Sequence, residues 1–195
     1  MDNATPAAPT ARASARERLL AAAEQLFYEE GINLVGIDRI IERAGVAKAS
    51  LYDVFGSKEE LIRSYLAARF ERRKARLTEK LARFRSPKEK LLGVFDAMGE
   101  IISEPGYRGC PFVRASAETT EKSKARTVCD ESRQWTHDLF AQLARDAGAS
   151  NPKKLARQLV VLYDGAMTAA SMDRDPQAAA TARAIAATLV DAQLK

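Results

Sequence analysis

The sequence contains few of the residues that build metal centres and disulfide frameworks. Its 195 residues include two cysteines, Cys110 and Cys129, and a single histidine, His137. Two thiols do not make a disulfide framework, and with one imidazole they leave little material for a zinc site. We therefore expect a fold that needs neither disulfides nor metal, and no bound cofactor.

Long apolar runs are also missing. No apolar stretch reaches the roughly 18 residues that a membrane-spanning helix requires, so we expect no membrane segment. Residues 1–14 are rich in Ala, Pro and Thr and lack the apolar region of a secretory signal. We interpret them as a flexible arm of a cytoplasmic protein.

The chemistry of an enzyme is not visible either. The sequence shows no paired carboxylates, no nucleophile with a nearby base, no phosphate-binding loop and no metal-ligand spacing. We therefore expect a binding protein rather than an enzyme.

What the sequence does contain favours helices. Hydrophobic residues make up 46% of the chain and charged residues 29%, as in an ordinary globular protein. Apolar residues recur at helical spacing, and no convincing strand alternation interrupts them. About nine helices are predicted, over residues 15–30, 37–44, 47–55, 57–84, 87–103, 112–119, 121–147, 152–172 and 176–194.

The second and third of these segments form a recognisable pair. Ile37, Ile40, Ile41 and Ala44 make a one-sided stripe over two turns, and Gly45 ends it. The next segment follows after a turn of two or three residues, with Leu51, Val54 and Phe55 expected to point inward. A short turn with glycine between two short amphipathic helices is typical of a helix-turn-helix.

Positive charge is concentrated just after this pair. Residues 1–60 carry seven basic and ten acidic side chains, whereas residues 61–90 carry eleven basic and three acidic ones. The later part of the chain is balanced. The basic segment is either a solvated helix face or a collar close to bound DNA, and the sequence leaves both interpretations open.

The stretch from Gly31 to Leu61 resembles the DNA-binding head of the tetracycline-repressor-like (TetR) family. The likeness covers residues 15–66, about a quarter of the chain. The residues that carry it are Ile37, Ile40, Ala44-Gly45-Val46, Lys48, Ser50, Leu51, Tyr52, Phe55 and Ser57-Lys58-Glu59.

The resemblance implies that the third helix enters the major groove of double-stranded DNA. The residues expected to contact DNA are Lys48, Ala49, Ser50, Tyr52, Asp53, Lys58, Arg39 and Arg16, with Arg12 of the arm as a further candidate. Three positions depart from the family. Gly36 supplies no hydroxyl before the second helix, and Val54 removes a phosphate contact. Asp53 would repel phosphate unless it accepts from a cytosine amino group, and it could equally face solvent.

The resemblance also implies an all-α architecture in three parts. We expect an arm (1–14), a three-helix helix-turn-helix domain (15–60) and a helical body for ligand binding and dimerisation (61–195). The candidate pocket residues are Phe95, Met98, Phe112, Trp135, Leu139 and Met167. The candidate interface residues of a homodimer are Leu155, Leu159, Leu162, Tyr163, Ala166, Ala184 and Ala187.

The implied function is transcriptional repression at a palindromic operator, released by an unidentified small molecule. Three alternatives stay open on the sequence alone. The chain could act as an activator, as a redox-responsive regulator through Cys110 and Cys129, or as a helical adaptor that binds only protein.

Overall fold

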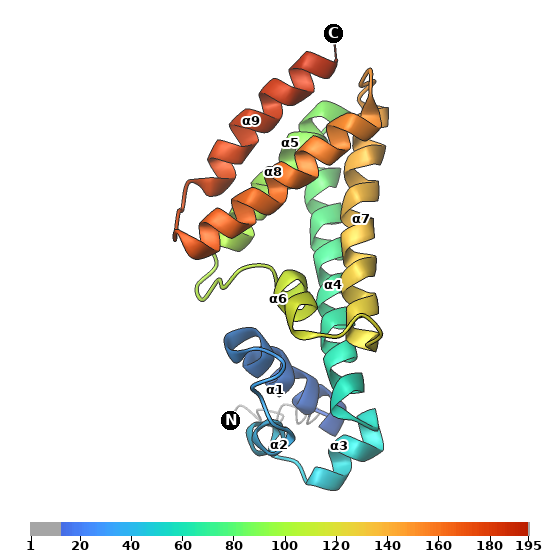
Figure 1. Cartoon of the computed structure of the whole chain (residues 1–195), viewed down its shortest axis with the longest axis vertical. Coiled ribbons are helices and arrows are strands. Elements are labelled where there is room, and N and C mark those ends of the chain that lie inside the picture. The colour runs from blue at the N-terminus through green and yellow to red at the C-terminus, as the bar shows by residue number, and fades with distance from the viewer. Residues whose placement is uncertain (1–12, 195) are drawn as a thin grey trace, which may run out of the picture.

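The computed structural model describes residues 13–194, which form nine α-helices and no strand (Figure 1). The predicted all-α class is therefore confirmed. Arg12 and most of the expected arm lie outside the described residues. The helices are α1 (Ala15–Glu30), α2 (Ile37–Ala44), α3 (Lys48–Phe55), α4 (Lys58–Ala82), α5 (Pro87–Ile102), α6 (Pro111–Glu118), α7 (Lys124–Asp146), α8 (Pro152–Met172) and α9 (Ala178–Gln193).

The molecule has a head and a body joined by one long helix. Helices α1–α3 form the head, and α4 leaves it to run alongside α7 (Figure 1). Helices α5, α8 and α9 complete the body at the far end, while the short α6 lies between body and head. None of the described helices is both long and apolar enough to cross a membrane.

Side-chain caps define where the helices begin. Ser86 accepts a hydrogen bond from the backbone N–H of Glu89 (3.2 Å), whose carboxylate accepts from the N–H of Ser86 (2.9 Å). These two reciprocal hydrogen bonds form a capping box, the motif that fixes the start of α5. At α4 only half of the motif forms. Ser57 accepts from the N–H of Glu60 (3.1 Å), but the Glu60 carboxylate pairs with Arg63 and Lys124 instead.

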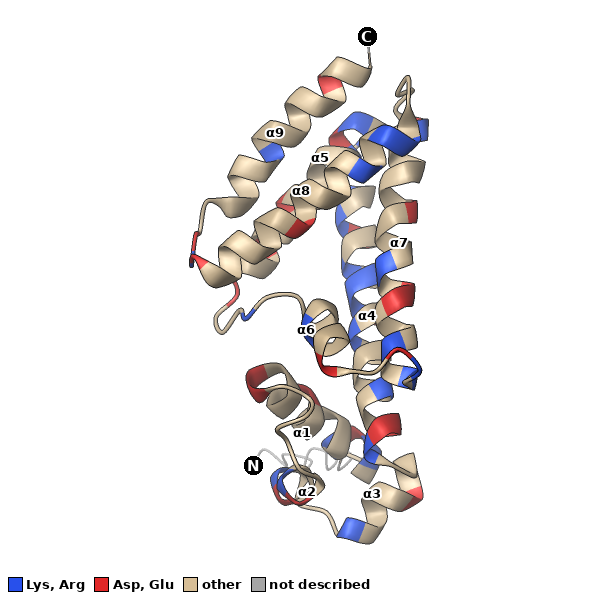
Figure 2. Cartoon of the chain, viewed as in Figure 1, with Lys and Arg blue, Asp and Glu red and all other residues tan. Residues whose placement is uncertain are grey.

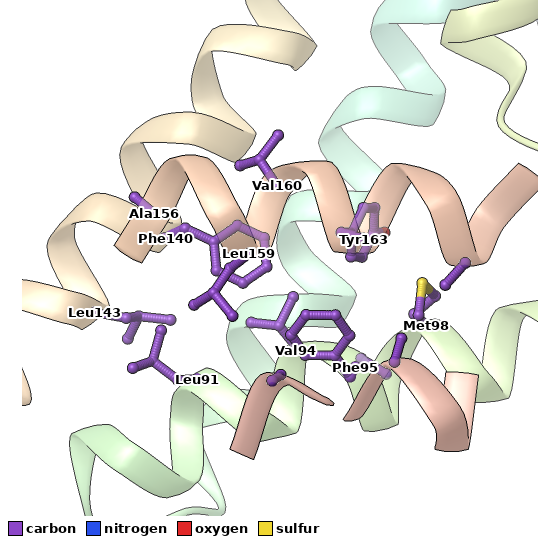
Figure 3. Close-up of a cluster of buried hydrophobic side chains, with 14 of the residues drawn as sticks. Leu91, Val94, Phe95, Met98, Phe140, Leu143, Ala156, Leu159, Val160 and Tyr163 are labelled. Atoms are coloured by element: carbon purple, nitrogen blue, oxygen red, sulfur yellow. The ribbon is translucent and has the colours of Figure 1, made fainter. Parts of the chain in front are cut away.

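Two apolar clusters hold the molecule together. The body cluster brings together Phe95, Phe140 and Tyr163, whose ring centroids lie 5.9–6.2 Å apart in tilted and edge-to-face pairs (Figure 3). The head cluster extends from α1–α3 into the first half of α4, α6 and the start of α7. The head therefore packs against the body through a continuous apolar contact.

Candidate DNA interface and effector cavity

The turn between α2 and α3 is fixed by a residue from α1. Gly45 adopts the left-handed conformation (φ 61°, ψ 44°) and ends α2. The Arg18 guanidinium donates to the carbonyl oxygens of Ala44 (3.3 Å) and Gly45 (2.9 Å). Carbonyls at a helix end lack partners inside the helix, so Arg18 satisfies them and ties the turn to α1.

The side chains predicted to face DNA lie on the outer face of α3. Lys48, Ala49, Tyr52 and Asp53 are exposed, and Ser50 is half-buried. Leu51 and Phe55 are buried in the head. This arrangement leaves one face of α3 available to a groove of DNA while the other face anchors the helix.

The expectation that Val54 points inward was wrong, because its side chain is 38% exposed. Helices α1 and α4 cover the side of α3 that carries Leu51 and Phe55. Successive residues are about 100° apart around a helix, so Val54 stands away from that side.

Several cations of this surface already have partners in the chain. The Lys48 ammonium lies 2.9 Å from an Asp38 carboxylate oxygen, and this hydrogen bond raises the pKa of Lys48. Arg39 pairs with Glu30, which raises the pKa of its guanidinium. DNA binding through either residue would therefore compete with an existing ion pair for its N–H donors.

The other two predicted cations lie in different surroundings. The Arg16 guanidinium carbon is 5.6 Å from the centroid of the Phe55 ring, which places it beside the end of α3. Lys58 opens α4, and its partial burial lowers the pKa of its ammonium, while the charge of Glu118 opposes that shift. Basic segments recur along α4 beyond the head (Figure 2).

Two cavities meet next to α6, one within the body and one between the body and the head. One, of about 550 Å³, lies among α4, α6, α7 and α8, and the other, of about 1000 Å³, lies among α1, α4 and the segment before α6. Arg73, Phe112, Tyr163 and Met167 line both. Cavities of this size fit a small organic ligand.

Of the six predicted pocket residues, two line the cavities and four do not. Phe112 and Met167 line both cavities. Phe95 and Met98 are 1% exposed and belong to the body core, and Leu139 packs against that core, so none of these three lines a cavity. Trp135 contributes to neither wall, but its ring stands edge-on to Phe70.

The two thiols differ in their surroundings. Cys110 and Cys129 both line the smaller cavity. Burial raises the pKa of the Cys129 thiol to about 11, which disfavours the reactive thiolate.

Contacts between head and body converge on the segment before and within α6. The Tyr28 hydroxyl donates to the carbonyl of Gly109 (3.2 Å) and accepts from the N–H of Arg108 (2.9 Å). The Arg114 guanidinium donates to the carbonyl of Tyr28 (2.5 Å). At the other end of α6, Glu118 accepts from the backbone N–H of Asn33 (2.9 Å).

Gly31 shows how close this contact is. It follows α1 with a positive φ (φ 101°, ψ 157°) that lies outside the left-handed helical region. A Cβ atom at this position would be 2.9 Å from a carboxylate oxygen of Glu118. The positive φ favours glycine at this position, and a larger residue would also make the Glu118 side chain move.

The predicted interface residues divide between the core and the surface. Leu155 and Leu159 are fully buried within the chain, and Tyr163 and Ala166 nearly so, because this side of α8 packs on α5 and α7. Leu162 and Ala187 are half-buried and Ala184 is exposed. The outward-facing residues of α8 and α9 form a stripe of small and apolar side chains: Val161, Gly165, Thr168, Met172, Ala184, Ile185 and Thr188.

Three functional candidates were missed by the sequence analysis: Arg18, Tyr28 and Arg73. Each is a polar residue on a helix whose apolar spacing gave the prediction of a helix. Their roles depend on partners 26 or more residues away along the chain. Periodicity carries no signal for such contacts.

A helix-turn-helix head on a helical body with a ligand-sized cavity defines a one-component DNA-binding regulator. The family profile "Bacterial regulatory proteins, tetR family" matches residues 19–65, and "Tetracyclin repressor-like, C-terminal domain" matches residues 87–186. The chain belongs to the TetR family and is a DNA-binding transcriptional regulator rather than an enzyme.

Individual relatives agree in fold and in class. A TetR-family regulator from Streptomyces coelicolor is 32% identical, with a TM-score of 0.88 over 93% of this chain and 96% of that one. The Escherichia coli repressor NemR is 28% identical over 170 residues, 82% of this chain and 85% of NemR. The activator FasR from Mycolicibacterium smegmatis is 28% identical over 149 residues, 75% of this chain and 68% of FasR.

Proposed function

We propose that this regulator is a cytoplasmic homodimeric repressor whose hold on a palindromic operator is weakened by a small molecule bound beside α6. The observation that carries the proposal is the position of residues 108–118. Their first part lines both cavities, and the same stretch contacts the head through Tyr28 and Asn33. A ligand that displaces this segment would therefore act on the head directly.

The DNA-binding part of the proposal rests on α3. Its exposed N-terminal residues, Lys48 and Ala49, can approach base edges, and the Tyr52 hydroxyl can reach a phosphate. Lys58 lies at the start of α4, where backbone N–H groups favour phosphate. Arg16 and Arg39 would contact phosphate beside this surface, and the exposed Asp53 carboxylate would accept from a base amino group or remain in solvent.

The dimeric part of the proposal rests on the stripe along α8 and α9. Val161 is 65% exposed and Ile185 46% exposed, and the small side chains around them would let helices of a second copy approach closely. A two-fold dimer presents two copies of α3, which must fit major grooves about one turn of DNA apart, roughly 34–36 Å. An operator with two-fold symmetry is the consequence.

The proposal is tested by selecting bound sequences from a random pool of double-stranded DNA with the full-length protein. We expect enrichment of one sequence with two inverted half-sites, bound at physiological salt at least 10³-fold more tightly than unrelated DNA. A gel shift with the selected sequence then reports occupancy. Enrichment of no sequence, or of one without internal symmetry, would contradict the proposal.

Repression and ligand release are tested on the same sequence. Placed across a promoter in a purified transcription reaction, the operator should make transcript fall as the regulator is added. Cell extracts fractionated by size should contain a small molecule that releases the DNA. Transcript that rises with the regulator would favour an activator.

A further inference from the structure

The most unusual feature of the cavities is an arginine held by neutral partners. Arg73 projects from α4, and its terminal nitrogens donate to the hydroxyls of Ser132 (3.1 Å) and Thr136 (2.9 Å) on α7. Within residues 13–194 no carboxylate forms an ion pair with it. Guanidinium groups in such partly buried positions are usually paired, because removing a charge from water is costly.

The two partners of Arg73 are polar side chains at buried positions that apolar residues usually occupy. Ser132 and Thr136 are 1% and 4% exposed, and apart from core tyrosines and Cys129 they are the buried polar side chains of the described part of the chain. They stand four residues apart and therefore on one face of α7. The Thr136 hydroxyl donates to the carbonyl of Ser132, which turns its lone pairs toward Arg73.

The surroundings of the guanidinium suit an anion with an apolar body. Three aromatic ring centroids lie 5.4–6.0 Å from its central carbon, those of Phe112, Trp135 and Tyr163. A guanidinium has five N–H donors, and the two hydroxyls take one from each terminal nitrogen, so donors remain for a ligand. Met167 and Phe112 supply apolar wall on both sides of Arg73.

The charge balance of the smaller cavity also favours an anionic ligand. Five arginines and two aspartates line it. The aspartates are engaged, since Asp130 pairs with Arg126 (2.9 Å) and Asp164 with Arg133 (2.5 Å). Arg73, Arg108 and Arg114 are left without a carboxylate partner among the described residues, so the cavity carries an excess of positive charge.

We infer that the effector is an organic carboxylate with an apolar body, and that Arg73 binds its carboxylate through paired N–H donors. This inference rests on the proposed function, because it names the class of ligand for the same site. Guanidinium and carboxylate match as two parallel hydrogen bonds, and Arg73 is half-buried, so the pair is partly shielded from water. Phe112 and Met167 would contact the apolar body.

The test compares acids with their neutral amides of equal size. The full-length protein is titrated with octanoate, octanamide, benzoate and benzamide, and binding is followed by calorimetry and by the fluorescence of Trp135, the only tryptophan. We expect at least one acid to bind ten-fold or more tightly than its amide. Equal affinities within each pair, or no binding of either acid at millimolar concentration, would overturn the inference.

Variants then locate the anion site. Arg73→Gln retains a donor for the Ser132 and Thr136 hydroxyls but removes the charge, and it should bring acid and amide to within three-fold of each other. Arg73→Lys should retain part of the preference, because it keeps the charge without the planar fork. The control Arg83→Gln, an exposed arginine at the end of α4 that lines neither cavity, should keep the wild-type preference. An unchanged preference in Arg73→Gln would overturn the assignment to Arg73.

Two further measurements separate folding and function from ligand class. If circular dichroism shows that Arg73→Gln does not fold, the inference is still tested by the acid and amide pairs on the wild type and on Arg73→Lys. Operator release is measured in parallel with the selected DNA. An acid that binds through Arg73 without releasing DNA would contradict ligand release but support the carboxylate site. A neutral effector that releases DNA and binds equally well to Arg73→Gln would support ligand release but contradict the carboxylate site.

Discussion

At the scale of single residues, the ion pair between Lys48 and Asp38 sets what the recognition helix can do. Lys48 is exposed and charged, but its ammonium is already hydrogen-bonded to a carboxylate of α2. In the proposed complex the Lys48 ammonium would share its three N–H donors between Asp38 and DNA, and the Asp38 charge would stand near the DNA. We therefore expect that removing the charge of Lys48 lowers operator affinity and that removing the charge of Asp38 raises it.

Lys48→Ala should weaken operator binding by about 1–3 kcal/mol, the loss typical of one base or phosphate contact. Asp38→Asn should strengthen it by a few-fold, because Lys48 is released and a negative charge leaves the DNA surface. Fluorescence anisotropy with labelled operator at fixed salt measures both. Lys153→Ala, an exposed lysine of α8 in the body, is the control and should change nothing. Equal affinity for Lys48→Ala and wild type would remove Lys48 from the interface.

A second residue-scale prediction concerns Cys129. A pKa of about 11 leaves roughly 100-fold less thiolate at pH 8 than an ordinary cysteine has. In a Cys110→Ser variant, iodoacetamide should therefore alkylate Cys129 far more slowly in the folded protein than in the unfolded chain. The rate should rise with pH beyond pH 9. Fast alkylation at pH 8, followed by mass spectrometry, would revive the redox-responsive alternative.

At the scale of elements, α6 and the segment before it form the contact between cavity and head. Tyr28→Phe removes the hydroxyl that bridges Gly109 and Arg108 and leaves the backbone N–H of Arg108 without its acceptor. Hydrogen exchange should then speed up across residues 106–112, because these amides open more readily. Tyr52→Phe, which loses an exposed hydroxyl on α3, is the matched control. Unchanged exchange in Tyr28→Phe would mean that this bridge does not hold the segment.

The elements themselves could be predicted from the sequence, whereas this contact could not. Stripes such as Ile37, Ile40 and Ala44 repeat within one helix, and the Ser86 cap acts over three residues, so both are readable locally. The hydrogen bonds that join Arg18 to Gly45 and Glu118 to Asn33 connect distant parts of the chain. The same limit explains the pocket and interface residues. An apolar residue such as Phe95 or Leu159 has the same spacing whether it faces a core, a cavity or a second chain.

At the scale of the whole molecule, dimerisation decides whether two heads can bind together. Val161 lies on the exposed stripe of α8, so Val161→Asp places a charge where the second copy is proposed to pack. Burying an unpaired carboxylate is costly, and the dimer should dissociate to monomer in sedimentation experiments. Val113→Asp, which changes a valine that is 61% exposed on α6, should leave the dimer intact.

The DNA measurement completes this prediction. A monomer keeps α3 and its contacts with one half-site, but it loses the gain that comes from linking two heads. Val161→Asp should therefore bind a single half-site as wild type does, while its affinity for the complete operator falls by 10²-fold or more. Loss of half-site binding would mean that the variant has damaged the fold instead. A dimer that survives the charge and still binds the complete operator would show that the copies pair through another surface.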